Sequence, residues 1–473
     1  MSKNNILKRS LTGVICFILL ITSFSGCVSE KEVSEKIEIP KMEAEEPDVY
    51  GFDFLGGTDV MPISGFYGPR LTHFSFDGQS MPNYVSDEFM ATLAEMGINH
   101  IGQSYTYQGE TPGAVAELLR LGEKYNIAIC VNDERLTSKL GEETLSVTEI
   151  DELLMEYRDF PAFAGVYVVD EPHNDNWYDG QNKHMSEYRQ LYANLKELDV
   201  FSYGNLFPLT SVSGSENYEK YLKEWVENCD VYYLSWDHYV WDRPVGREDY
   251  FANLSLGRKY AEMAEIPFWS YIEAGGNHVD TAEDTEEYYP LEGEFYWNVH
   301  TSLAYGAKGI QYFPIIQPSW YANAISQPYD FERNGLLGVM GNKNRWYYYA
   351  QNVNKQIAAV DEVLMNSVNK GVIATGERAK KETEVSEHIM KTDAWRELIG
   401  IEGETLIGCF NYKGKSAYYV VNYEHEYAQN ITLNFADNYD MTVTQDAEKS
   451  YVNTKSLELT LKAGEGVLVV IES

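Results

Sequence analysis

Short apolar runs alternate with amphipathic segments from about residue 60 to residue 362. The apolar runs predict buried strands, and the segments between them carry apolar residues at helical spacing, as in Asp87–Met96. The strands predicted in this way are 60–66, 99–105, 127–132, 164–170, 201–207, 231–237, 268–273 and 309–315. The predicted helices are 87–96, 113–125, 148–158, 184–197, 216–228, 250–264, 291–305 and 344–362. Strict alternation indicates parallel strands joined by helical crossovers.

Eight such units over about 300 residues match the count and size of a (β/α)8 TIM barrel, which we predict for residues 51–366. A doubly wound open sheet is the alternative fold. No Gly-x-Gly-x-x-Gly motif follows the first strand, which removes the commonest cofactor use of that alternative. The sequence therefore predicts an α/β protein that needs no cofactor.

From about residue 367 the helical spacing stops and a period of two begins. The segments 406–412, 417–423, 431–435, 457–461 and 467–471 read as strands, and Lys413-Gly414 reads as a tight turn. This pattern predicts a small antiparallel β-sandwich domain at 367–473. No catalytic cluster occurs in it, so packing support for the barrel is the role that the sequence favours over sugar binding.

The N-terminus reads as a targeting segment. Lys3, Lys8 and Arg9 precede an apolar stretch at 11–21 that is too short to span a bilayer comfortably. Phe24-Ser-Gly-Cys27 then resembles the lipobox of bacterial lipoproteins, with Phe24 where that pattern usually has Leu. The resemblance implies a signal peptide at 1–26, a lipid on Cys27 and attachment to the extracellular face of the cell membrane. Residues 27–50 would be a solvated tether. An ordinary secretory signal is the alternative.

Charge and cysteine usage exclude several classes of function. The formal net charge of −36 argues against nucleic acid and against an anionic lipid surface, so the N-terminal lipid is the only membrane contact predicted. Cys130, Cys229 and Cys409 are too widely spaced for a disulfide framework or a Cys-x-x-Cys metal site. No His-Glu-x-x-His motif occurs, and we predict no metal.

Polar residues stand where the apolar strands end, which is where chemistry takes place in barrels of this type. The set comprises Tyr105, Asn132, Asp170, Glu171, Asn205, Asp237, His238, Tyr239, Glu273 and Gln311.

Two glutamates in this set suit the cleavage of a glycosidic bond, which needs a proton donor and a nucleophile. Glu171 ends the fourth strand before Pro172, and Glu273 ends the seventh strand before Ala-Gly-Gly. Strands four and seven lie nearly opposite each other in a barrel, so the carboxylates are expected ~5–5.5 Å apart, as retention requires. Glu273 would be the nucleophile, and Glu171, with its pKa raised by negative neighbours, the acid and base. Asp170 shares this site only if a bulge or turn follows it.

With these glutamates, the chain resembles the retaining (β/α)8 glycosidases of glycoside hydrolase clan A. The segments 302–307 and Gly309-Ile-Gln-Tyr-Phe-Pro314 look like the eighth-strand region of that group. The resemblance implies hydrolysis of a β-linked glycoside in an oligo- or polysaccharide with retention, and an exo-acting β-galactosidase-like activity is our first expectation.

One departure leaves an alternative open. The clan usually has Asn before its acid, whereas Asp170 stands here. An Asp-Glu pair resembles the substrate-assisted β-N-acetylhexosaminidases, in which Asp170 would orient the acetamide, Glu171 would be the acid, and Glu273 would only bind sugar. A further alternative is a non-catalytic glycan-binding surface lipoprotein.

The remaining strand-end residues are candidates for substrate binding. Asp237, His238 and Tyr239 end the sixth strand and supply hydrogen-bonding groups, and two tryptophans offer indole faces to sugar rings. The long, aromatic connection at 316–343 suggests a subsite wall or lid. The predicted substrate-binding residues are Asp170, Asn132, Tyr105, Asp237, His238, Tyr239, Trp269, Gln311 and Trp320.

Overall fold

The computed structural model describes most of the chain beyond its N-terminal segment. The described residues are 39–45, 47, 52–69, 75–76, 79–80, 83–104, 112–141, 143–173, 183–212, 214–241, 247–275, 289–317, 335–338 and 340–472. Residues 39–473 form one compact unit, separate from residues 1–38. The predictions made for the signal segment, Cys27, Tyr105 and Trp320 lie outside the described residues. Within these ranges, no helix is both long and apolar enough to cross a membrane.

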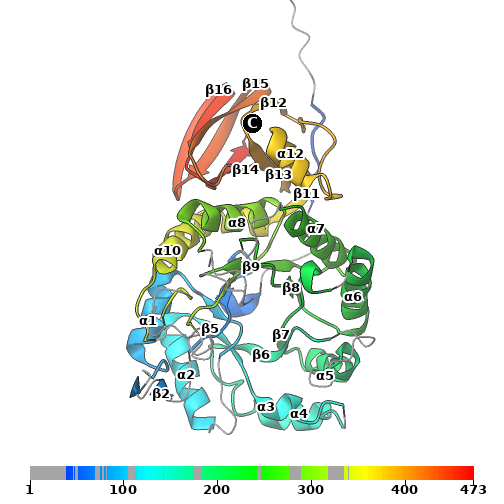
Figure 1. Ribbon diagram of the computed structural model, residues 1–473, viewed down its shortest axis with the longest axis vertical. Helices are drawn as coiled ribbons and strands as arrows, with labels where there is room; N and C mark the ends of the chain where they lie inside the picture. Colours follow the sequence, from blue (N-terminus) through cyan, green and yellow to red (C-terminus); the bar gives the residue numbers. More distant parts are fainter. Residues whose placement is uncertain are drawn as a thin grey trace, which may run out of the picture. The chain divides into compact units, whose positions relative to one another are not determined.

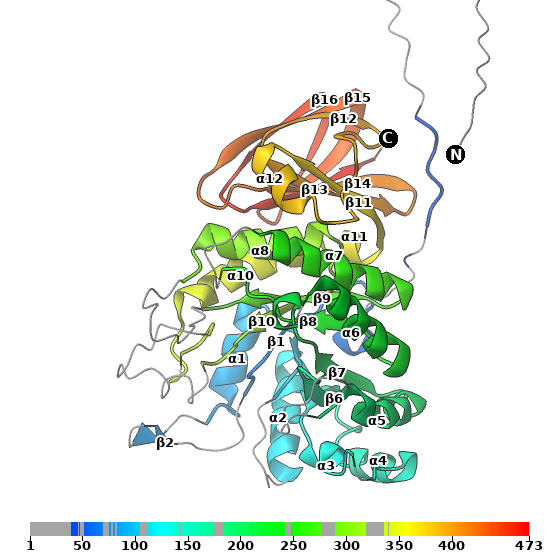
Figure 2. The same cartoon turned by 45° about the vertical axis from the view of Figure 1, so that its right-hand side comes forward.

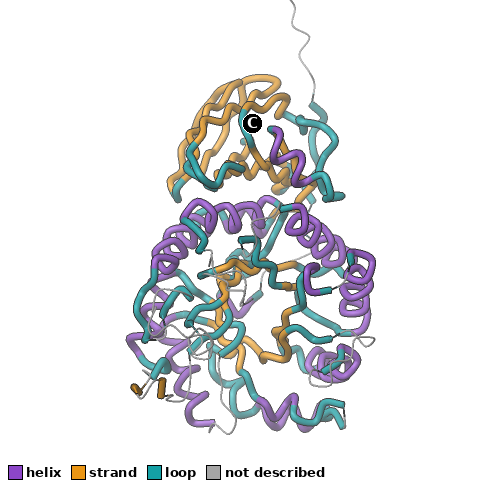
Figure 3. The backbone as a smooth tube through the Cα atoms, in the orientation of Figure 1, coloured by secondary structure: helices purple, strands orange, loops and turns teal. Residues whose placement is uncertain are grey.

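Eight parallel strands of the described residues form two four-stranded sheets. The first sheet has the order β4-β5-β6-β7, and the second has the order β1-β10-β9-β8. The strands are β1 Ile63–Gly65, β4 His100–Ile101, β5 Ala128–Val131, β6 Phe163–Asp170, β7 Phe201–Asn205, β8 Leu234–Trp236, β9 Phe268–Glu273 and β10 Ile310–Phe313. In Figures 1 and 3 they occupy the centre of this part of the molecule, with helices outside them. The predicted α/β class with parallel strands is confirmed.

Backbone hydrogen bonds also join the edges of the two sheets. The N–H of Leu206, just after β7, donates to the carbonyl of Ser235 in β8 at 3.0 Å. At the other edge, the N–H of Asn99 donates to the carbonyl of Ile63 in β1 at 3.1 Å. The carboxyl ends of the strands therefore lie side by side from one sheet to the next, and this is where the polar strand-end residues are found.

Helices connect successive strands, as the spacing predicted. They include α1 Asp87–Met96, α2 Pro112–Tyr125, α4 Val147–Leu154, α5 Met185–Glu197, α6 Ser215–Asn228, α7 Glu248–Met263, α8 Glu292–Ala304, α10 Arg345–Ala358 and α11 Asp361–Met365. The first begins where the Ser86 side chain accepts the N–H of Phe89, and it ends at Gly97, which has a φ of 88°. In Figure 2 these helices surround the strands.

Aromatic rings fill the space between the strands below the carboxyl ends. Trp269 is fully buried, with its ring centroid 4.2 Å from that of Tyr233 and 6.0 Å from that of Phe201. Phe52 and Phe54 pack against the Phe201 ring from the segment that contains the short helix η1 Asp53–Leu55. Protein therefore covers the faces of Trp269, which does not fit the sugar contact predicted for this residue.

The C-terminal residues form the predicted antiparallel structure. Its strands are β11 Ser367–Thr375, β12 Leu398–Glu402, β13 Thr405–Tyr412, β14 Lys415–Asn422, β15 Gln429–Gln445, β16 Glu448–Leu461 and β17 Gly466–Ile471. Lys413 and Gly414 form the predicted turn, both with positive φ. All seven strands belong to one hydrogen-bonded sheet, in which β15 pairs with β12 along one half and with β17 along the other. A second apolar core packs between its strands.

Helix α8 lies between the parallel strands and the antiparallel sheet, contacting β9 on one side and β13 and β14 on the other (Figure 1). Twelve of its residues are buried, because both faces are covered. Its His300 ring nitrogen Nδ1 lies 2.8 Å from the Tyr419 hydroxyl of β14. Burial lowers the pKa of His300 to about 3, so this contact is made by a neutral ring.

Candidate active site

Three strand ends meet at the side chain of Asn205. Its amide nitrogen donates to Oδ1 of Asp170, at the end of β6, at 3.1 Å and to Oδ1 of Asp237, just after β8, at 3.0 Å. The Ser235 hydroxyl donates to the amide oxygen of Asn205 at 3.0 Å, which fixes the orientation of the amide. Two of the predicted acids, far apart in the sequence, are therefore held by one side chain.

Asp170 and Glu171 both face this site, and the backbone shows why. A bulge interrupts the pairing of β6 with β7 between Tyr167 and Val169. Glu171 itself has a φ of 47°, in the left-handed region that a non-glycine residue enters at a cost. Its N–H donates to the carbonyl of Asn205 at 2.9 Å, which holds it in this conformation. The bulge lies before Asp170 and shifts both residues together, so it is the positive φ of Glu171 that supplies the turn required between them.

The three carboxyls at this position perturb one another. A hydrogen bond joins the side chains of Glu171 and Asp237. Burial raises the pKa of Glu171, and the negative charges of Asp237 and Asp170 raise it further. The pKa of Asp237 is also raised by burial, but hydrogen bonds from Asn205, Glu171 and Tyr239 oppose that rise. Glu171 is therefore the carboxyl that keeps its proton, and Asp237 is its ionised acceptor.

Asp170 is the more open member of this group. Burial and the charge of Asp237 raise its pKa, while the hydrogen bond from Asn205 lowers it. Its side chain remains exposed to solvent, which limits the rise. Glu171 is half-buried and Asp237 is buried. Solvent exposure therefore decreases from Asp170 through Glu171 to Asp237.

Glu273 ends β9 and is only 2% exposed. Its Oε2 accepts the backbone N–H of Trp241 at 3.2 Å. A hydrogen bond from a fixed backbone group restrains the orientation of a carboxylate. This is the setting that a nucleophilic carboxylate requires.

Tyr239 connects Glu273 to the other acids. Burial raises the pKa of Tyr239, and the charges of Asp237, Asp170, Glu171 and Glu273, in that order, raise it further. Its hydroxyl forms a hydrogen bond with Asp237. The side chain is half-buried. A single phenol therefore lies within electrostatic reach of both predicted catalytic glutamates, which places them in the same region of the molecule.

A buried chain of hydrogen bonds lies beneath Asn205. Gln311 of β10 donates to the Ser235 hydroxyl at 2.7 Å and accepts a hydrogen bond from the hydroxyl of Tyr203. The Tyr203 hydroxyl is also bonded to that of Tyr271 in β9. The sequence predicted that Gln311 touches the substrate. In the structure Gln311 has no exposed surface, so it orients the site from below instead.

His238 and Asn132 differ in burial. His238 is buried, with its Nδ1 lying 3.1 Å from the Asn253 side-chain oxygen of α7. This contact ties the segment after β8 to a helix, and the sugar contact predicted for His238 stays a prediction. Asn132, immediately after β5, is half-buried, and its predicted role also stays a prediction.

Three half-buried aromatic residues near the acids, Tyr67, Tyr167 and Phe313, were not predicted from the sequence. The Phe313 ring centroid lies 5.4 Å from that of Tyr239 and 5.7 Å from that of Tyr67. The charge of Asp170 contributes to the raised pKa of Tyr167, which places that ring near the carboxyls. Tyr67 and Phe313 stand at or just beyond the ends of β1 and β10, so the strand-end rule that selected the acids would also have selected them.

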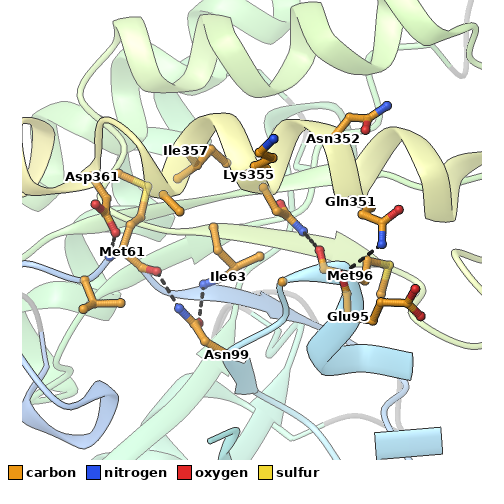
Figure 4. A pocket seen from close by; sticks show the side chains of 14 residues that line it. Met61, Ile63, Glu95, Met96, Asn99, Gln351, Asn352, Lys355, Ile357 and Asp361 are labelled. Atoms are coloured by element: carbon orange, nitrogen blue, oxygen red, sulfur yellow. Dashed lines mark hydrogen bonds between the residues drawn. The ribbon is translucent and has the colours of Figure 1, made fainter. Parts of the chain in front are cut away.

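A hollow of about 470 Å³ lies away from these acids, between β1, the end of α1 and α10. Figure 4 shows Asn99 in it, bonded to the backbone of Met61 and Ile63, and Gln351, bonded to the backbone of Glu95. Its polar side chains therefore bind neighbouring backbone groups, and we regard it as a packing feature. In the described ranges, no group of three or more His, Cys, Asp or Glu side chains is arranged to hold a metal ion.

A second cluster, formed by Ser64, His100 and Cys130, contains residue types that are common in catalytic sites. The Ser64 hydroxyl lies 2.8 Å from His100 Nδ1, and the Cys130 sulfur lies 3.4 Å from His100 Nε2. All three side chains are fully buried among the parallel strands. Burial lowers the pKa of His100 to about 3 and raises that of Cys130, so neither charged form is populated at neutral pH. Cys130 is therefore a buried packing residue, and the thiols of Cys229 and Cys409 are likewise buried.

The sequence matches no protein-family model, and no curated protein matches it. The fold, however, is similar to solved glycoside hydrolases. A glycoside hydrolase of family 5 from Bacteroides vulgatus ATCC 8482 is 11% identical with a TM-score of 0.50, over 91% of this chain and 93% of that one. A β-galactosidase from Bacillus circulans sp. alkalophilus is 9% identical with a TM-score of 0.50, over 86% and 99%. At these identities, the likeness concerns the fold alone.

Proposed function

We propose that this protein is a glycoside hydrolase that cleaves a β-linked glycoside with retention. The observation that carries the proposal is the carboxyl cluster: Glu171 is protonated through its bond to Asp237, and Tyr239 lies within reach of both Glu171 and Glu273. A protonated acid and a buried, hydrogen-bonded carboxylate near one solvent-accessible point are the two groups that double displacement needs.

The steps follow from these protonation states. Glu171 donates its proton to the leaving glycosidic oxygen while a carboxylate oxygen of Glu273 attacks the anomeric carbon, giving a glycosyl ester. Glu171, now ionised, removes a proton from the water that attacks the same carbon, and Glu273 leaves as a carboxylate. Each cycle therefore returns both glutamates to their starting state.

We also propose a finer description of the fold and a first class of substrate. In this proposal the two parallel sheets form a (β/α)8 barrel, and the antiparallel sheet is a β-sandwich. One of the similar structures is a β-galactosidase. The net charge of −36 disfavours polyanionic substrates. For both reasons, the first substrates to assay are neutral β-galactosides and related sugars that are released from a chain end.

Substitution of Glu273 tests the proposal. Purified wild type is assayed on a panel of aryl β-glycosides and oligosaccharides, alongside Glu273→Ala and Glu273→Gln. Gln keeps the shape and the acceptor for the Trp241 N–H but does not form the ester, so both variants should lose activity by a factor of about 10⁴ or more. Wild-type-like activity of either variant would contradict the nucleophile role. Binding without turnover by the wild type would instead favour the glycan-binding lipoprotein.

The substrate-assisted β-N-acetylhexosaminidase is the second candidate, and one observation favours it. Asp170 and Glu171 face the same site, and Asp170 is open to solvent and held by Asn205. In that mechanism Asp170 would orient the 2-acetamido group of the substrate. Strict dependence on that group, and loss of activity in Asp170→Asn with activity retained in Glu273→Gln, would select this candidate.

We also propose that the mature protein is a surface lipoprotein anchored through Cys27. The support is the sequence Phe24-Ser-Gly-Cys27 after an apolar stretch. Expression of wild type and Cys27→Ala in a bacterial host, followed by membrane fractionation and incorporation of labelled palmitate, tests this. Label and membrane association should depend on Cys27, and equal label in both proteins would refute the anchor.

A further inference from the structure

The hydrogen bond that holds Glu273 comes from a residue packed against the C-terminal domain. Trp241 lies five residues beyond the end of β8, and its N–H donates to Oε2 of Glu273 at 3.2 Å. Because one carboxylate oxygen is fixed, the direction of the other is fixed too. The position of the Trp241 N–H therefore contributes to the direction in which Glu273 points.

The indole of Trp241 is held by contacts on several sides, and the residue is only 5% exposed. The Arg247 guanidinium carbon lies 4.3 Å from the ring centroid, at stacking distance for a cation on an indole. The His425 ring meets it edge-on at 4.8 Å, and the Trp297 ring of α8 does so at 5.6 Å. These contacts leave the indole little freedom to shift.

Arg247 is in turn bound by the C-terminal domain. Its Nη2 donates to Nε2 of His425 at 3.1 Å, and its Nη1 lies 3.9 Å from a carboxylate oxygen of Glu382. Burial and the positive charges of Arg247 and Arg378 lower the pKa of His425 to about 3, so its ring is neutral and its Nε2 accepts. The other ring nitrogen lies 3.6 Å from an oxygen of Glu294 in α8. Arg247 therefore lies between the C-terminal domain and Trp241.

We propose that the C-terminal domain is a positioning part of the active site, in which His425 and Glu382 hold Arg247 on the Trp241 indole and thereby fix the N–H that orients Glu273. This inference rests on the proposed function for its effect on catalysis. It gives the C-terminal domain a second role beyond packing, and it makes Arg247 and Trp241 positioning residues that do not touch the substrate.

A second arginine, Arg378, makes its contacts within the C-terminal domain and does not reach Trp241. Arg378 donates to the carbonyl of Tyr423 at 3.1 Å and to the Glu424 carboxylate at 3.0 Å. Its guanidinium carbon also lies 5.4 Å from the Tyr423 ring centroid. Arg378 thus shares with Arg247 its residue type and a cation–aromatic contact, but its contacts stay within the C-terminal domain and it has no link to Trp241.

The test compares Arg247→Met with Arg378→Met in the full mature chain. We expect Arg247→Met to lower kcat about 10- to 100-fold with KM within about threefold, because a nucleophile displaced by about 1 Å loses its near-attack geometry. Arg378→Met should keep kcat within about threefold, because the contacts that it removes lie within the C-terminal domain and do not reach Trp241. Arg247→Lys keeps the charge without the planar group and should recover part of kcat. Equal kcat losses in the two Met variants, or none in Arg247→Met, would overturn the proposal.

Hydrogen exchange of the Trp241 amide gives a readout that does not require activity. We expect its exchange to speed up at least about tenfold in Arg247→Met and to stay unchanged in Arg378→Met. If wild type proves inactive on every glycoside, the proposed function fails, whereas this exchange difference still decides whether the C-terminal domain positions the bond to Glu273. Unchanged exchange in Arg247→Met would refute the positioning claim.

Discussion

Replacement of Asp237 by Asn removes the negative charge that keeps Glu171 protonated. The two carboxyls share a hydrogen bond, and the charge of Asp237 is the largest electrostatic contribution, after burial, to the raised pKa of Glu171. Asn keeps the shape and an acceptor oxygen for the amide of Asn205. The substitution therefore isolates the charge, and the pKa of Glu171 should fall.

The size of this fall follows from the geometry. Two unit charges about 4 Å apart in a medium of effective dielectric constant about 20 interact by about 4 kcal/mol, equivalent to about 3 pKa units. Glu171 is half-buried, so solvent screens part of this interaction. We expect a fall of about 1–2 units. The fraction of enzyme with a protonated acid at alkaline pH then decreases, and the alkaline limb of kcat/KM moves to lower pH by the same amount.

Two assays measure this fall. The pH profile of kcat/KM reports the limb, and NMR titration of the Glu171 side-chain carbon reports the pKa without requiring turnover. Ser235→Ala is the matched control, because it removes a hydrogen bond to Asn205 without changing charge. It should lower stability by about 1 kcal/mol and leave the limb in place. An unchanged or higher pKa of Glu171 in Asp237→Asn would refute the assignment of the proton.

Three further predictions concern stability and binding. In the folded protein Glu171 retains its proton, whereas in the unfolded chain it loses that proton above about pH 4.3. Glu171→Gln should therefore stabilise the protein relative to wild type, by up to about 1.4 kcal/mol for each pH unit above that value. A pH-independent difference between the unfolding free energies of the two proteins would contradict the raised pKa of Glu171. Gly102→Ala places a Cβ 2.0 Å from the Tyr203 ring and should lower the free energy of unfolding, measured in urea, by about 2–4 kcal/mol. Gly57→Ala is the control, because its Cβ has nothing within 4 Å, and it should leave the free energy of unfolding unchanged. Equal effects of the two substitutions would show that the packing described around Gly102 is wrong. Tyr67→Ala should raise KM roughly three- to tenfold with little change in kcat, and an unchanged KM would exclude ring contact with the sugar.

The hydrophobic pattern predicted the fold in some detail. The expected helix 87–96 and strand 268–273 have the observed bounds, and the strand expected at 164–170 begins one residue earlier. The other six strands expected before residue 366 occur in shortened form, whereas the five expected after it are longer than predicted. The shortening has a local cause: the ends of these apolar runs, such as Phe66 or Leu206, lie beyond the ladder but are still buried by neighbouring rings and strands. Periodicity reports burial rather than hydrogen bonding. The long hairpin of β15 and β16 was missed in part, because polar residues at 436–440 and 448–456 interrupt the alternation.

The site was predicted only as a set of strand ends. Sequence order identifies Glu171, Glu273 and Asp237 as residues at one edge, because parallel strands end on the same side. It does not reveal that Asn205 joins Asp170 to Asp237, that Glu171 adopts a positive φ, or that Trp241 donates to Glu273. Each of these depends on side-chain geometry between separate segments. Trp269 was misassigned for the same reason, since an aromatic residue on a strand does not show which end of the interior it fills.

Covalent trapping tests the central claim most directly. Wild type is incubated with 2-deoxy-2-fluoro-β-glycosyl fluorides of several sugar configurations, digested, and analysed by mass spectrometry. The proposed mechanism predicts one added glycosyl group per chain, attached to Glu273, and slower labelling in Glu171→Gln when a poorer leaving group must be protonated. A label on another residue, or efficient turnover of β-glycosides with no label on Glu273, would contradict it.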